Sequence, residues 1–472
     1  MSFVQSTFLV LFLVTVALYF VRVDVRWQNR VLLVASVVFY GWLHWWWVAL
    51  LWGTAAVDFL LSQLMVRSAT HKRLWLALSV TSNLGLLFVF KYLGFCVDNV
   101  VAGLTALGFN PSVQTLNLIL PAGISFYTFQ SLSYTIDVYR GELRPRTRFE
   151  TFLTYVSFFP QLMAGPIERA AHLLPQVEKA RTWSSSNLRA GTGLVMWGLF
   201  KKVVIADTLA PYVDKVFLLD APPASLMWAA TTAFMLQIYA DFSGYTDIAR
   251  GTARILGIDL VRNFDEPYLA ATTQEFWQRW HISLSTWIRD YLLAPLLGDA
   301  NRVSPLRFGA AVTFTMVVMG LWHGAGWNFL LFGVFQATAI GFYAVVSRLL
   351  PARIKAIPGG RYAAAALHIL VVGELGALFF RESSMAHILT QLTRVPWGGT
   401  VGEMAMALGL LGLCVIANIP FVIEHVARRT VLPWIPTHRA GLMVETTVWS
   451  MYVVAIAIAW NTDGADFVYF QF

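Results

Sequence analysis

The sequence predicts an all-α polytopic membrane protein, on the evidence of its composition and its long apolar runs. Of the 472 residues, 13% are charged and 57% belong to the apolar set, and the mean hydropathy is +0.62. A soluble domain carries about 25% charged residues. So few polar side chains cannot cover a water-exposed surface, and disorder needs the opposite composition. The apolar runs also lack the alternation of a membrane β-barrel. These observations exclude a soluble enzyme and leave helical spans.

Apolar runs of about 20 residues, the length that crosses a bilayer, recur along the whole chain. We expect about eleven to thirteen spans among the candidate segments at residues 3–21, 31–66 (two spans separated near 46–53), 74–95, 97–120 (a weaker segment), 121–137, 150–165, 189–206, 225–241, 307–322, 327–347, 363–380, 403–423 and 442–460. At this length the spans occupy about half of the chain. The remainder is rich in Trp, Tyr, Pro and Gly, which predicts re-entrant and interfacial helices around a cavity.

Basic side chains set the expected orientation of the spans, because Lys and Arg collect in cytoplasmic loops. We expect four basic clusters in the cytoplasm, and the N-terminus on the periplasmic side: Arg22, Arg26 and Arg30; Arg67, Lys72 and Arg73; Arg140, Arg144, Arg146 and Arg148; Arg348, Arg353, Lys355 and Arg361. This distribution explains the net charge of +8 without a nucleic-acid partner. No charged segment precedes the run at 3–21 and no A-x-A site follows it, so we interpret it as a retained span.

Several common catalytic signatures are absent from the sequence. There is no G-x-S-x-G, H-E-x-x-H or G-x-x-x-x-G-K-[ST] motif, so a serine hydrolase, a zinc protease or a P-loop motor has no support. The two cysteines, Cys96 and Cys414, lie in or beside apolar runs and provide neither a disulfide framework nor a metal spacing. No Cys or His lies close in sequence to His281 or His323, so we expect no metal site and no bound cofactor.

The densest polar and aromatic stretch is residues 263–291, NFDEPYLAATTQEFWQRWHISLSTWIRDY. Its charged side chains make it too polar to span the bilayer. One interpretation is an interfacial helix with aromatic anchors and snorkelling arginines. The other is an amphipathic wall of a cavity, with His281 pointing inward.

A second notable stretch is residues 320–333, GLWHGAGWNFLLFG, where His323 ends an apolar run that begins near Phe308. An ionisable residue at membrane depth is costly and therefore indicates a functional site. The alternative is a helix-packing histidine, which the G-x-x-x-G spacing of Gly320 and Gly324 favours. A buried imidazole tends to stay neutral, which is the form that a general base needs.

Three shorter stretches also carry polar groups in apolar surroundings. In YADFSGYTD, Asp241 and Asp247 either cap a helix end or belong to a site. In PQLMAGPIER (160–169), two prolines and a glycine predict a helix broken at membrane depth, beside protein or water. In FKKVVIAD, Lys201 and Lys202 either bind the phosphates of a donor or face anionic lipid headgroups.

Taken together, the motifs resemble the membrane-bound O-acyltransferases, and within them the bacterial branch of alginate-type O-acetyltransferases. The resemblance rests on PAGISFYTFQSLSYTIDVYRG (121–141), FFPQLMAGPIER (158–169), GLFKKVVIAD (198–207), YADFSGYTDIARG (239–251), EFWQRWHISLSTWIRDYLLAPL (275–296), GLWHGAGWNFLLFG (320–333) and the tail FVYFQF (467–472). The branch that attaches D-alanine to teichoic acid has a similar layout. The resemblance implies one membrane domain over 1–472, with N-terminal helices at 1–120, a motif-bearing catalytic core at 121–333 and C-terminal helices at 334–472.

The family fold implies a ring of tilted helices around a thinned centre with a central tunnel. The resemblance further implies that an acetyl group moves from a cytoplasmic thioester, expected to be acetyl-CoA, across the bacterial inner membrane. The acceptor would be a hydroxyl of an exopolysaccharide such as alginate, or of a periplasmic acceptor protein. Peptidoglycan, acetylated cellulose and teichoic-acid D-alanylation stay open as alternatives. His323 would be the active-site histidine and His281 the second polar residue.

A hydroxyl is a weak nucleophile that needs a base, and the oxyanion formed at the thioester carbon needs a donor. Candidate donors and tunnel residues are Trp322, Trp327, Asn328, Trp280, Arg279, Asp241, Tyr245 and Gln130, together with His281. A different class of function is a proton-coupled transporter with His and Asp as a proton relay. We find no internal repeat between halves of the sequence, which counts against a transporter.

Overall fold

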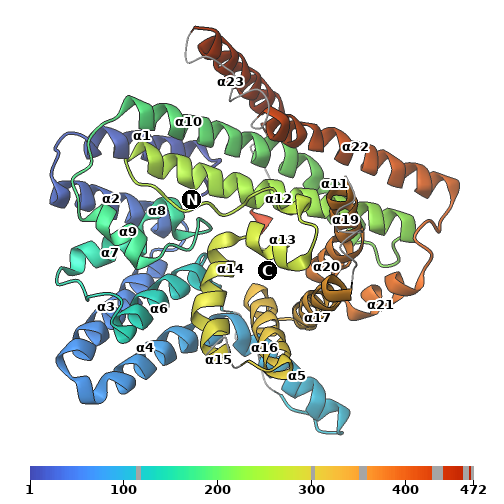
Figure 1. Ribbon diagram of the computed structural model, residues 1–472, viewed down its shortest axis with the longest axis horizontal. Coiled ribbons are helices and arrows are strands. Elements are labelled where there is room, and N and C mark those ends of the chain that lie inside the picture. The colour runs from blue at the N-terminus through green and yellow to red at the C-terminus, as the bar shows by residue number, and fades with distance from the viewer. Residues whose placement is uncertain (113–117, 299–302, 350–358, 428–438, 461–466, 469–472) are drawn as a thin grey trace.

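The structure, a computed structural model, describes residues 1–112, 118–298, 303–349, 359–427, 439–460 and 467–468, and within these ranges the regular elements are helices. The helices up to residue 87 lie on one side of the molecule and those of residues 305–426 on the other, with the helix at 93–106 beside the latter group (Figure 1). Helices α12 (Ala224–Ile255) and α13 (Thr273–Arg279) lie between the two groups. The arrangement confirms the prediction of an all-α polytopic protein.

The N-terminal group contains α1 (Ser6–Tyr19), α2 (Val25–Gly41), α3 (Trp46–Arg67), η1 (Ala69–His71), α4 (Lys72–Leu87), η2 (Phe88–Tyr92) and α5 (Leu93–Ala106). The break between α2 and α3 falls at 42–45, earlier than the predicted 46–53. Helices α4 and α5 are continuous through η2, a turn of π-helix, so separate spans at 74–95 and 97–120 are wrong. The apolar sequence gives no stop signal there, and a π-turn bends a helix without ending it.

The next group contains α6 (Ile124–Arg140), α7 (Phe149–Ser157), α8 (Phe159–Leu162) and α9 (Ala170–Val177). The predicted span at 150–165 is wrong, because the helix ends at Ser157. A new short helix begins at Phe159 with Pro160 in its first turn, since proline has no N–H with which to continue the previous helix. Residues 151–168 are buried in protein, as a broken helix at this depth requires.

Helices α10 (Ser185–Leu199), η3 (Phe200–Ala206), α11 (Asp207–Phe217) and α12 (Ala224–Ile255) form the centre. Four glycines let the backbones of α10 and α12 touch: Gly191, Gly198, Gly244 and Gly251. A Cβ atom at Gly198 would lie 2.6 Å from the carbonyl oxygen of Gly244, and one at Gly251 would lie 2.6 Å from that of Gly191. Small residues at such regular spacing are typical of close helix contacts in membranes.

Helix α12 continues for 32 residues, past the predicted end at 241. A helix end capped by Asp241 or Asp247 is therefore wrong. Both carboxylates lie inside the helix because neighbouring lysines neutralise them. Lys202 contacts Asp241 at 3.0 Å, and Lys201 contacts Asp247 at 2.7 Å.

Residues 263–297 fold as short pieces: η4 (Pro267–Leu269), α13 (Thr273–Arg279), α14 (Ile282–Ile288), η5 (Arg289–Leu293) and α15 (Ala294–Leu297). Helices α13 and α14 have seven residues each, about 10 Å at 1.5 Å per residue, and cannot cross a bilayer. Asp290 pairs with Arg169 at 3.0 Å, and its carbonyl oxygen accepts from Arg140 at 3.2 Å. The segment therefore lies against the basic loops.

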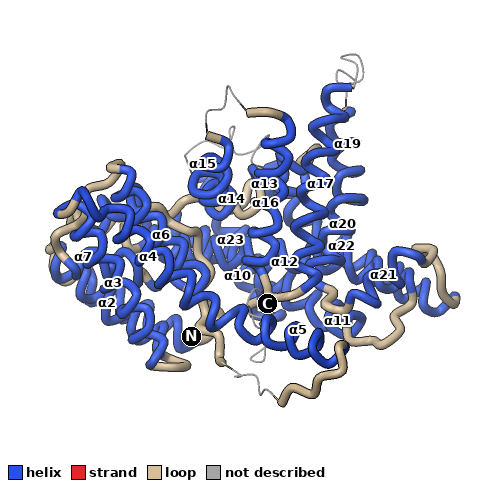
Figure 2. The backbone as a smooth tube through the Cα atoms, turned by 90° about the horizontal axis from the view of Figure 1, so that it is seen from below, coloured by secondary structure: helices blue, strands red, loops and turns tan. Residues whose placement is uncertain are grey.

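The C-terminal group contains α16 (Pro305–His323), α17 (Trp327–Leu349), α19 (Gly360–His368), η7 (Ile369–Gly373), α20 (Glu374–Arg381), α21 (Met385–Thr393), α22 (Val401–Val426) and α23 (Arg439–Ala459). Gly320 and Gly333 bring the backbones of α16 and α17 together, which confirms the predicted packing role of Gly320. Its predicted partner Gly324 follows the end of α16 and lies against the ring of Phe329 instead. Figure 2 shows α17, α19 and α20 aligned in one direction, whereas α22 runs across Figure 1 in about the same direction as α12.

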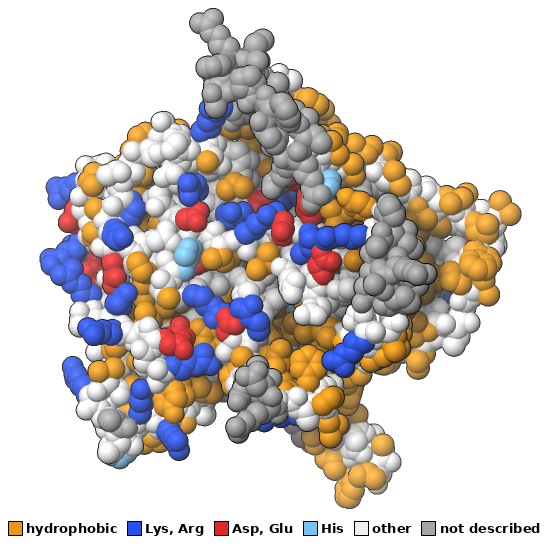
Figure 3. Space-filling model, viewed as in Figure 1, with side chains coloured by type: hydrophobic (Ala, Val, Ile, Leu, Met, Phe, Trp, Pro, Cys, Tyr) orange, Lys and Arg blue, Asp and Glu red, His pale blue; other side chains and the backbone are white. Residues whose placement is uncertain are grey.

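Six stretches among the described residues are long and apolar enough to cross a membrane: Trp46–Arg67, Lys72–Ala106, Pro305–His323, Trp327–Leu349, Gly360–Arg381 and Val401–Val426. They confirm a multi-pass membrane protein. Charged side chains gather over the middle and left of the face in Figure 3, and hydrophobic side chains over the right, where α17 to α22 lie. Several of the other predicted spans fold as shorter or more polar helices packed inside the protein.

The contact between α10 and α12 predicts that Gly198→Ala destabilises the protein. The added methyl group must displace backbone, and such overpacking costs about 1–3 kcal/mol. Gly193→Ala is the matched control on the same helix, because its Cβ would meet only Trp449, at 3.7 Å. In detergent, the melting temperature of Gly198→Ala should be lower than that of the wild type, and the melting temperature of Gly193→Ala should be unchanged. Equal melting of both variants would contradict the close contact.

Candidate active site

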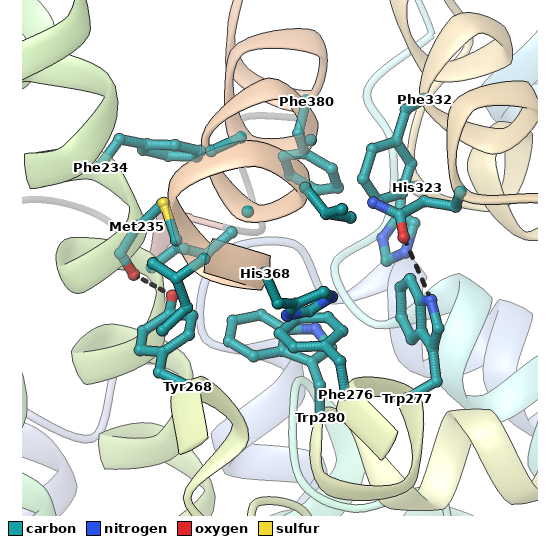
Figure 4. A pocket seen from close by; sticks show the side chains of 17 residues that line it. Phe234, Met235, Tyr268, Phe276, Trp277, Trp280, His323, Phe332, His368 and Phe380 are labelled. Carbon is teal, nitrogen blue, oxygen red and sulfur yellow. Dashed lines mark hydrogen bonds between the residues drawn. The ribbon is translucent and has the colours of Figure 1, made fainter. Parts of the chain in front are cut away.

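His323 lies between two cavities and belongs to the wall of both. The first, which we call the aromatic chamber, is lined mainly by rings: Phe234, Tyr268, Phe276, Trp277, Trp280, Phe332 and Phe380, with His323, Gln336 and His368. Figure 4 shows these side chains converging on one space. The second, the N-terminal cavity, is lined by Leu43, Trp47, Lys91, residues 120–126, Met163, Trp322 and His323. The histidine is thus the residue through which the two spaces meet.

The position of His323 follows from where α16 ends. Its ring packs edge-on against Phe380, with ring centroids 5.1 Å apart, and the residue is 4% exposed. The carbonyl groups at the helix end have no partner within the helix. Lys91 donates to the carbonyl oxygens of Trp322 and His323 at 2.7 and 2.8 Å, and the Tyr92 hydroxyl donates to that of Leu321 at 2.9 Å. These bonds fix the end of α16, and the histidine with it.

His281 lies on the other side of the Trp322 ring. The Trp322 centroid is 5.0 Å from that of His323 and 6.1 Å from that of His281. His281 is fully buried, and its Nδ1 donates to the amide oxygen of Asn263 at 3.1 Å. Its φ of 44° is uncommon for a residue with a side chain, and strained backbone of this kind clusters at functional sites.

Burial lowers the pKa of His281 to about 3. Desolvation is the cause, because it disfavours the charged imidazolium. At neutral pH this imidazole is therefore uncharged and serves as a hydrogen-bonding group rather than a cation.

Two further cavities lead from the aromatic chamber toward the basic loops. The lateral cavity, between α12, α19 and α22, shares Met235, Tyr268 and Ile369 with the chamber. The charged cavity shares Tyr239, Glu266 and Glu424 with the lateral cavity, and it is lined by Lys201, Asp247, Arg250 and Arg262. The cavities therefore form a series of adjoining spaces that reaches His323 and continues past it as the N-terminal cavity.

The two ends of this series lie at opposite ends of the helices. At one end, the charged cavity is lined by Arg262 and Glu266. Glu266 belongs to the segment 263–297, which contacts the basic loops, and Arg262 directly precedes that segment. The N-terminal cavity is lined by Leu43 and residues 120–126. Leu43 follows the end of α2 that is remote from Arg26. Residues 120–126 include the first residues of α6, at the end of that helix remote from Arg140.

The structure brings some of the predicted site residues to these cavities. Trp322 lines the N-terminal cavity, Trp280 lines the aromatic chamber, and Lys201 lines the charged cavity. Trp322 also stacks on Phe129, with the rings 5.4 Å apart and inclined by 12°. Lys201 and His281 thus lie near opposite ends of the route, with His281 beside Trp322.

The other predicted residues make packing contacts away from the cavity walls. Gln130 donates to the carbonyl oxygen of Tyr155 at 2.7 Å, and Asn328 donates to that of Phe379 at 3.2 Å. Arg279 pairs with Glu275 at 2.9 Å. Tyr245 stacks on Phe3. Trp327 is 56% exposed and donates to Asn99. Asp241 and Lys202 form an ion pair with each other.

Sequence reasoning missed two groups at the site. Lys91 lies within an apolar run, and a lysine inside a predicted span is itself a signal of function. Gln336 lines the aromatic chamber and accepts from the indole N–H of Trp277 at 3.3 Å. No sequence spacing links Gln336 to Trp277, because α13 and α17 meet only in the folded chain.

Comparisons with known proteins agree with this geometry. A family model described as the membrane-bound O-acyltransferase family matches residues 142–356. The probable alginate O-acetylase of Azotobacter vinelandii is 40% identical over 366 residues, which cover 76% of this chain and 70% of that protein. The chain belongs to the membrane-bound O-acyltransferase family. It is therefore an acyltransferase enzyme, and the transporter interpretation is set aside.

More distant relatives differ in the substrate that their names state. The peptidoglycan O-acetyltransferase of Helicobacter pylori is 34% identical over 345 residues, covering 67% of this chain and 64% of that protein. The teichoic acid D-alanyltransferase of Bacillus subtilis is 27% identical over 245 residues, covering 48% and 60%. The matched family region contains His281, His323 and most of the aromatic chamber.

The lowered pKa of His281 predicts a stability that depends on pH. In the unfolded chain the imidazole binds a proton below about pH 6.5, whereas in the folded acyltransferase it stays neutral down to about pH 3. Stability should therefore fall as the pH drops through this window. The melting temperature of His281→Gln should depend less steeply on pH between pH 7 and 5 than that of the wild type. The control His71→Gln, at an exposed site, should keep the wild-type slope. Parallel curves for wild type and His281→Gln would refute the assignment.

Proposed function

We propose that this acyltransferase moves an acetyl group from acetyl-CoA, supplied on the basic-loop side, to a hydroxyl group on the opposite side of the inner membrane. The product is an O-acetylated exopolysaccharide such as alginate, acetylated directly or through a periplasmic acceptor protein. The observation that carries the proposal is that His323 belongs to two cavities that open toward opposite ends of the helices. The similarity to alginate O-acetylases supports an acetyl group and a polysaccharide.

The donor is proposed to enter through the charged and lateral cavities. Phosphate groups of coenzyme A need cations, and Lys201, Arg250 and Arg262 line the charged cavity. Lys202 is less suited, because it lies between Asp207 at 2.9 Å and Asp241 at 3.0 Å. With the basic loops in the cytoplasm, the N-terminus lies in the periplasm.

In the proposed mechanism His323 takes the proton of the acceptor hydroxyl as that oxygen attacks the thioester carbon. A C–O bond forms, and the carbonyl oxygen becomes an oxyanion. The side-chain amide of Gln336 lines the aromatic chamber and is the proposed oxyanion donor. Collapse of the intermediate breaks the C–S bond, and the leaving thiolate takes the proton from His323. No acyl-enzyme intermediate and no net proton transfer are required.

The aromatic chamber also explains why the transfer would occur in preference to hydrolysis. Its lining is almost entirely ring and methylene surface, and such a surface excludes water from the thioester. Electrostatic interactions with the reacting atoms are stronger there than in water.

Replacement of His323 tests the proposed function. His323→Ala and His323→Gln should each lower the release of CoA thiol from acetyl-CoA, and the acetyl ester content of polymer, by about 10²–10⁴, the usual range for a general base. His281→Ala should have a smaller effect, because that ring contacts Trp322 rather than lining the aromatic chamber. His71→Gln is the control.

All variants should elute from detergent as single species. Near wild-type acetylation by His323→Gln would show that His323 is not the base. If His323→Ala fails to accumulate while His323→Gln accumulates and is inactive, the catalytic assignment stands on the glutamine variant.

A further inference from the structure

A third histidine, His368, lines the aromatic chamber, and the mechanism above gives it no role. It is the last residue of α19 and is 2% exposed. Figure 4 shows its side chain among those that converge on the chamber, and its ring centroid lies 5.9 Å from that of Phe276. Buried polar groups are nearly always hydrogen-bonded, so the partners of its two ring nitrogens decide what this histidine can do.

His368 lies where the donor route enters the aromatic chamber. Ile369, the next residue, lines both the chamber and the lateral cavity. His323 belongs instead to the wall that the chamber shares with the N-terminal cavity. A donor whose thioester reaches His323 therefore passes His368 with the part of the molecule that lies behind its sulfur atom.

One ring nitrogen of His368 has a hydrogen-bond partner and the other has none in the described part of the chain. Its Nε2 lies 3.3 Å from the hydroxyl oxygen of Thr273, which is fully buried. Its Nδ1 is buried and unpartnered among the described residues. A water molecule needs about two to four polar partners, and the lining of the chamber is almost entirely ring and methylene surface. A polar group of a ligand is therefore the better partner for Nδ1.

The hydroxyl group of Thr273 decides which nitrogen carries the proton. A buried imidazole that no carboxylate contacts stays neutral, so one nitrogen has a proton and the other a lone pair. His368 belongs to no ion pair within the described ranges, and Thr273 has no other side-chain partner there. The hydroxyl group donates to Nε2, because in the opposite arrangement its proton would be buried without an acceptor. Nδ1 then presents an unpaired N–H to the chamber.

We propose that the Nδ1–H group of His368 donates to the carbonyl oxygen of the first amide in the pantetheine arm of the donor. This inference rests on the proposed function and adds a residue that selects the donor by its arm. Behind the sulfur atom, the arm has two methylene groups and then this amide. The rings of Phe332, Trp277 and Phe276 form a chain of contacts between His323 and His368. The order of apolar and polar groups is thus the same in the arm and in the chamber wall.

The test uses three small thioesters as competitors of radiolabelled acetyl-CoA, with the purified full-length protein in detergent. The amide probe is S-acetyl-N-acetylcysteamine, which ends after the first amide of the arm. The ester probe has an oxygen atom in place of the N–H group of that amide. The alkyl probe, S-pentyl thioacetate, has neither the N–H nor the carbonyl group. Inhibition constants compare the binding of the three probes whether or not the probes react.

Substitutions at His368 measure the hydrogen bond as a change in the preference for the amide probe over the alkyl probe. His368→Met removes the N–H donor, and the ratio of the two inhibition constants should change about tenfold relative to the wild type, equivalent to about 1.4 kcal/mol. The ester probe should lose as much as the amide probe, because both present a carbonyl oxygen. His368→Gln retains an N–H donor and should keep part of the preference. Tyr343→Phe is the control, because Tyr343 contacts the ring of His368 without lining the chamber.

Two further measurements separate recognition from packing. With acetyl-CoA itself, His368→Met should raise KM about tenfold with little change in kcat, because the bond is made equally in the ground state and the transition state. Thr273→Val removes the hydroxyl group that keeps the proton on Nδ1. The preference for the amide probe should therefore fall in this variant too, although the side chain at residue 368 is unchanged.

The outcomes distinguish the inference from the function on which it rests. If the wild type releases no CoA, or if His323→Ala is equally active, the proposed function fails. If the wild type is active and His323→Ala is not, an unchanged preference in His368→Met overturns the role of His368, and so does an amide probe that does not inhibit. Loss of the amide probe alone, with the ester probe retained, shows that Nδ1 accepts from the N–H group and overturns the donor assignment. If His368→Met fails to accumulate, an unchanged preference in Thr273→Val overturns the inference.

Discussion

The arrangement of the site depends on how one helix end is satisfied away from water. Helix α16 stops at His323 inside the protein, and its last carbonyl groups must accept hydrogen bonds there. Lys91 and Tyr92 provide these bonds. They are adjacent in sequence, and adjacent residues of an α-helix do not face the same neighbour. The π-turn η2, from Phe88 to Tyr92, changes this spacing and presents both groups to α16.

Much of the fold and part of the site could be predicted from the sequence. Composition and apolar run length decided the fold class, because a bilayer imposes a length and a polarity on any helix that crosses it. The polarity of 263–291 showed that this segment does not span, and its contacts with Arg140 and Arg169 agree. His323 was a candidate because a histidine that ends an apolar run is costly unless it has a role.

The remaining features depended on partners that are distant in sequence. Helix α12 passes through Asp241 and Asp247 because Lys202 and Lys201 lie opposite, and no local rule shows that pairing. Gly198 was not recognised as a helix contact, because its partner Gly244 lies on another helix. The tunnel candidates Trp327 and Asn328 lie away from the cavity walls. The sequence could not show this, because a helix face can be identified as a cavity wall only when the opposing helix is known.

The central claim is that His323 separates a donor route on the basic-loop side from an acceptor cavity on the other. Sealed membrane vesicles of known orientation, supplied externally with radiolabelled acetyl-CoA, test it most directly. Inverted vesicles, with the cytoplasmic face outward, should consume the label through wild-type protein and not through His323→Ala, while intact right-side-out vesicles should consume none. Equal consumption in both orientations, or consumption in right-side-out vesicles alone, would contradict the account.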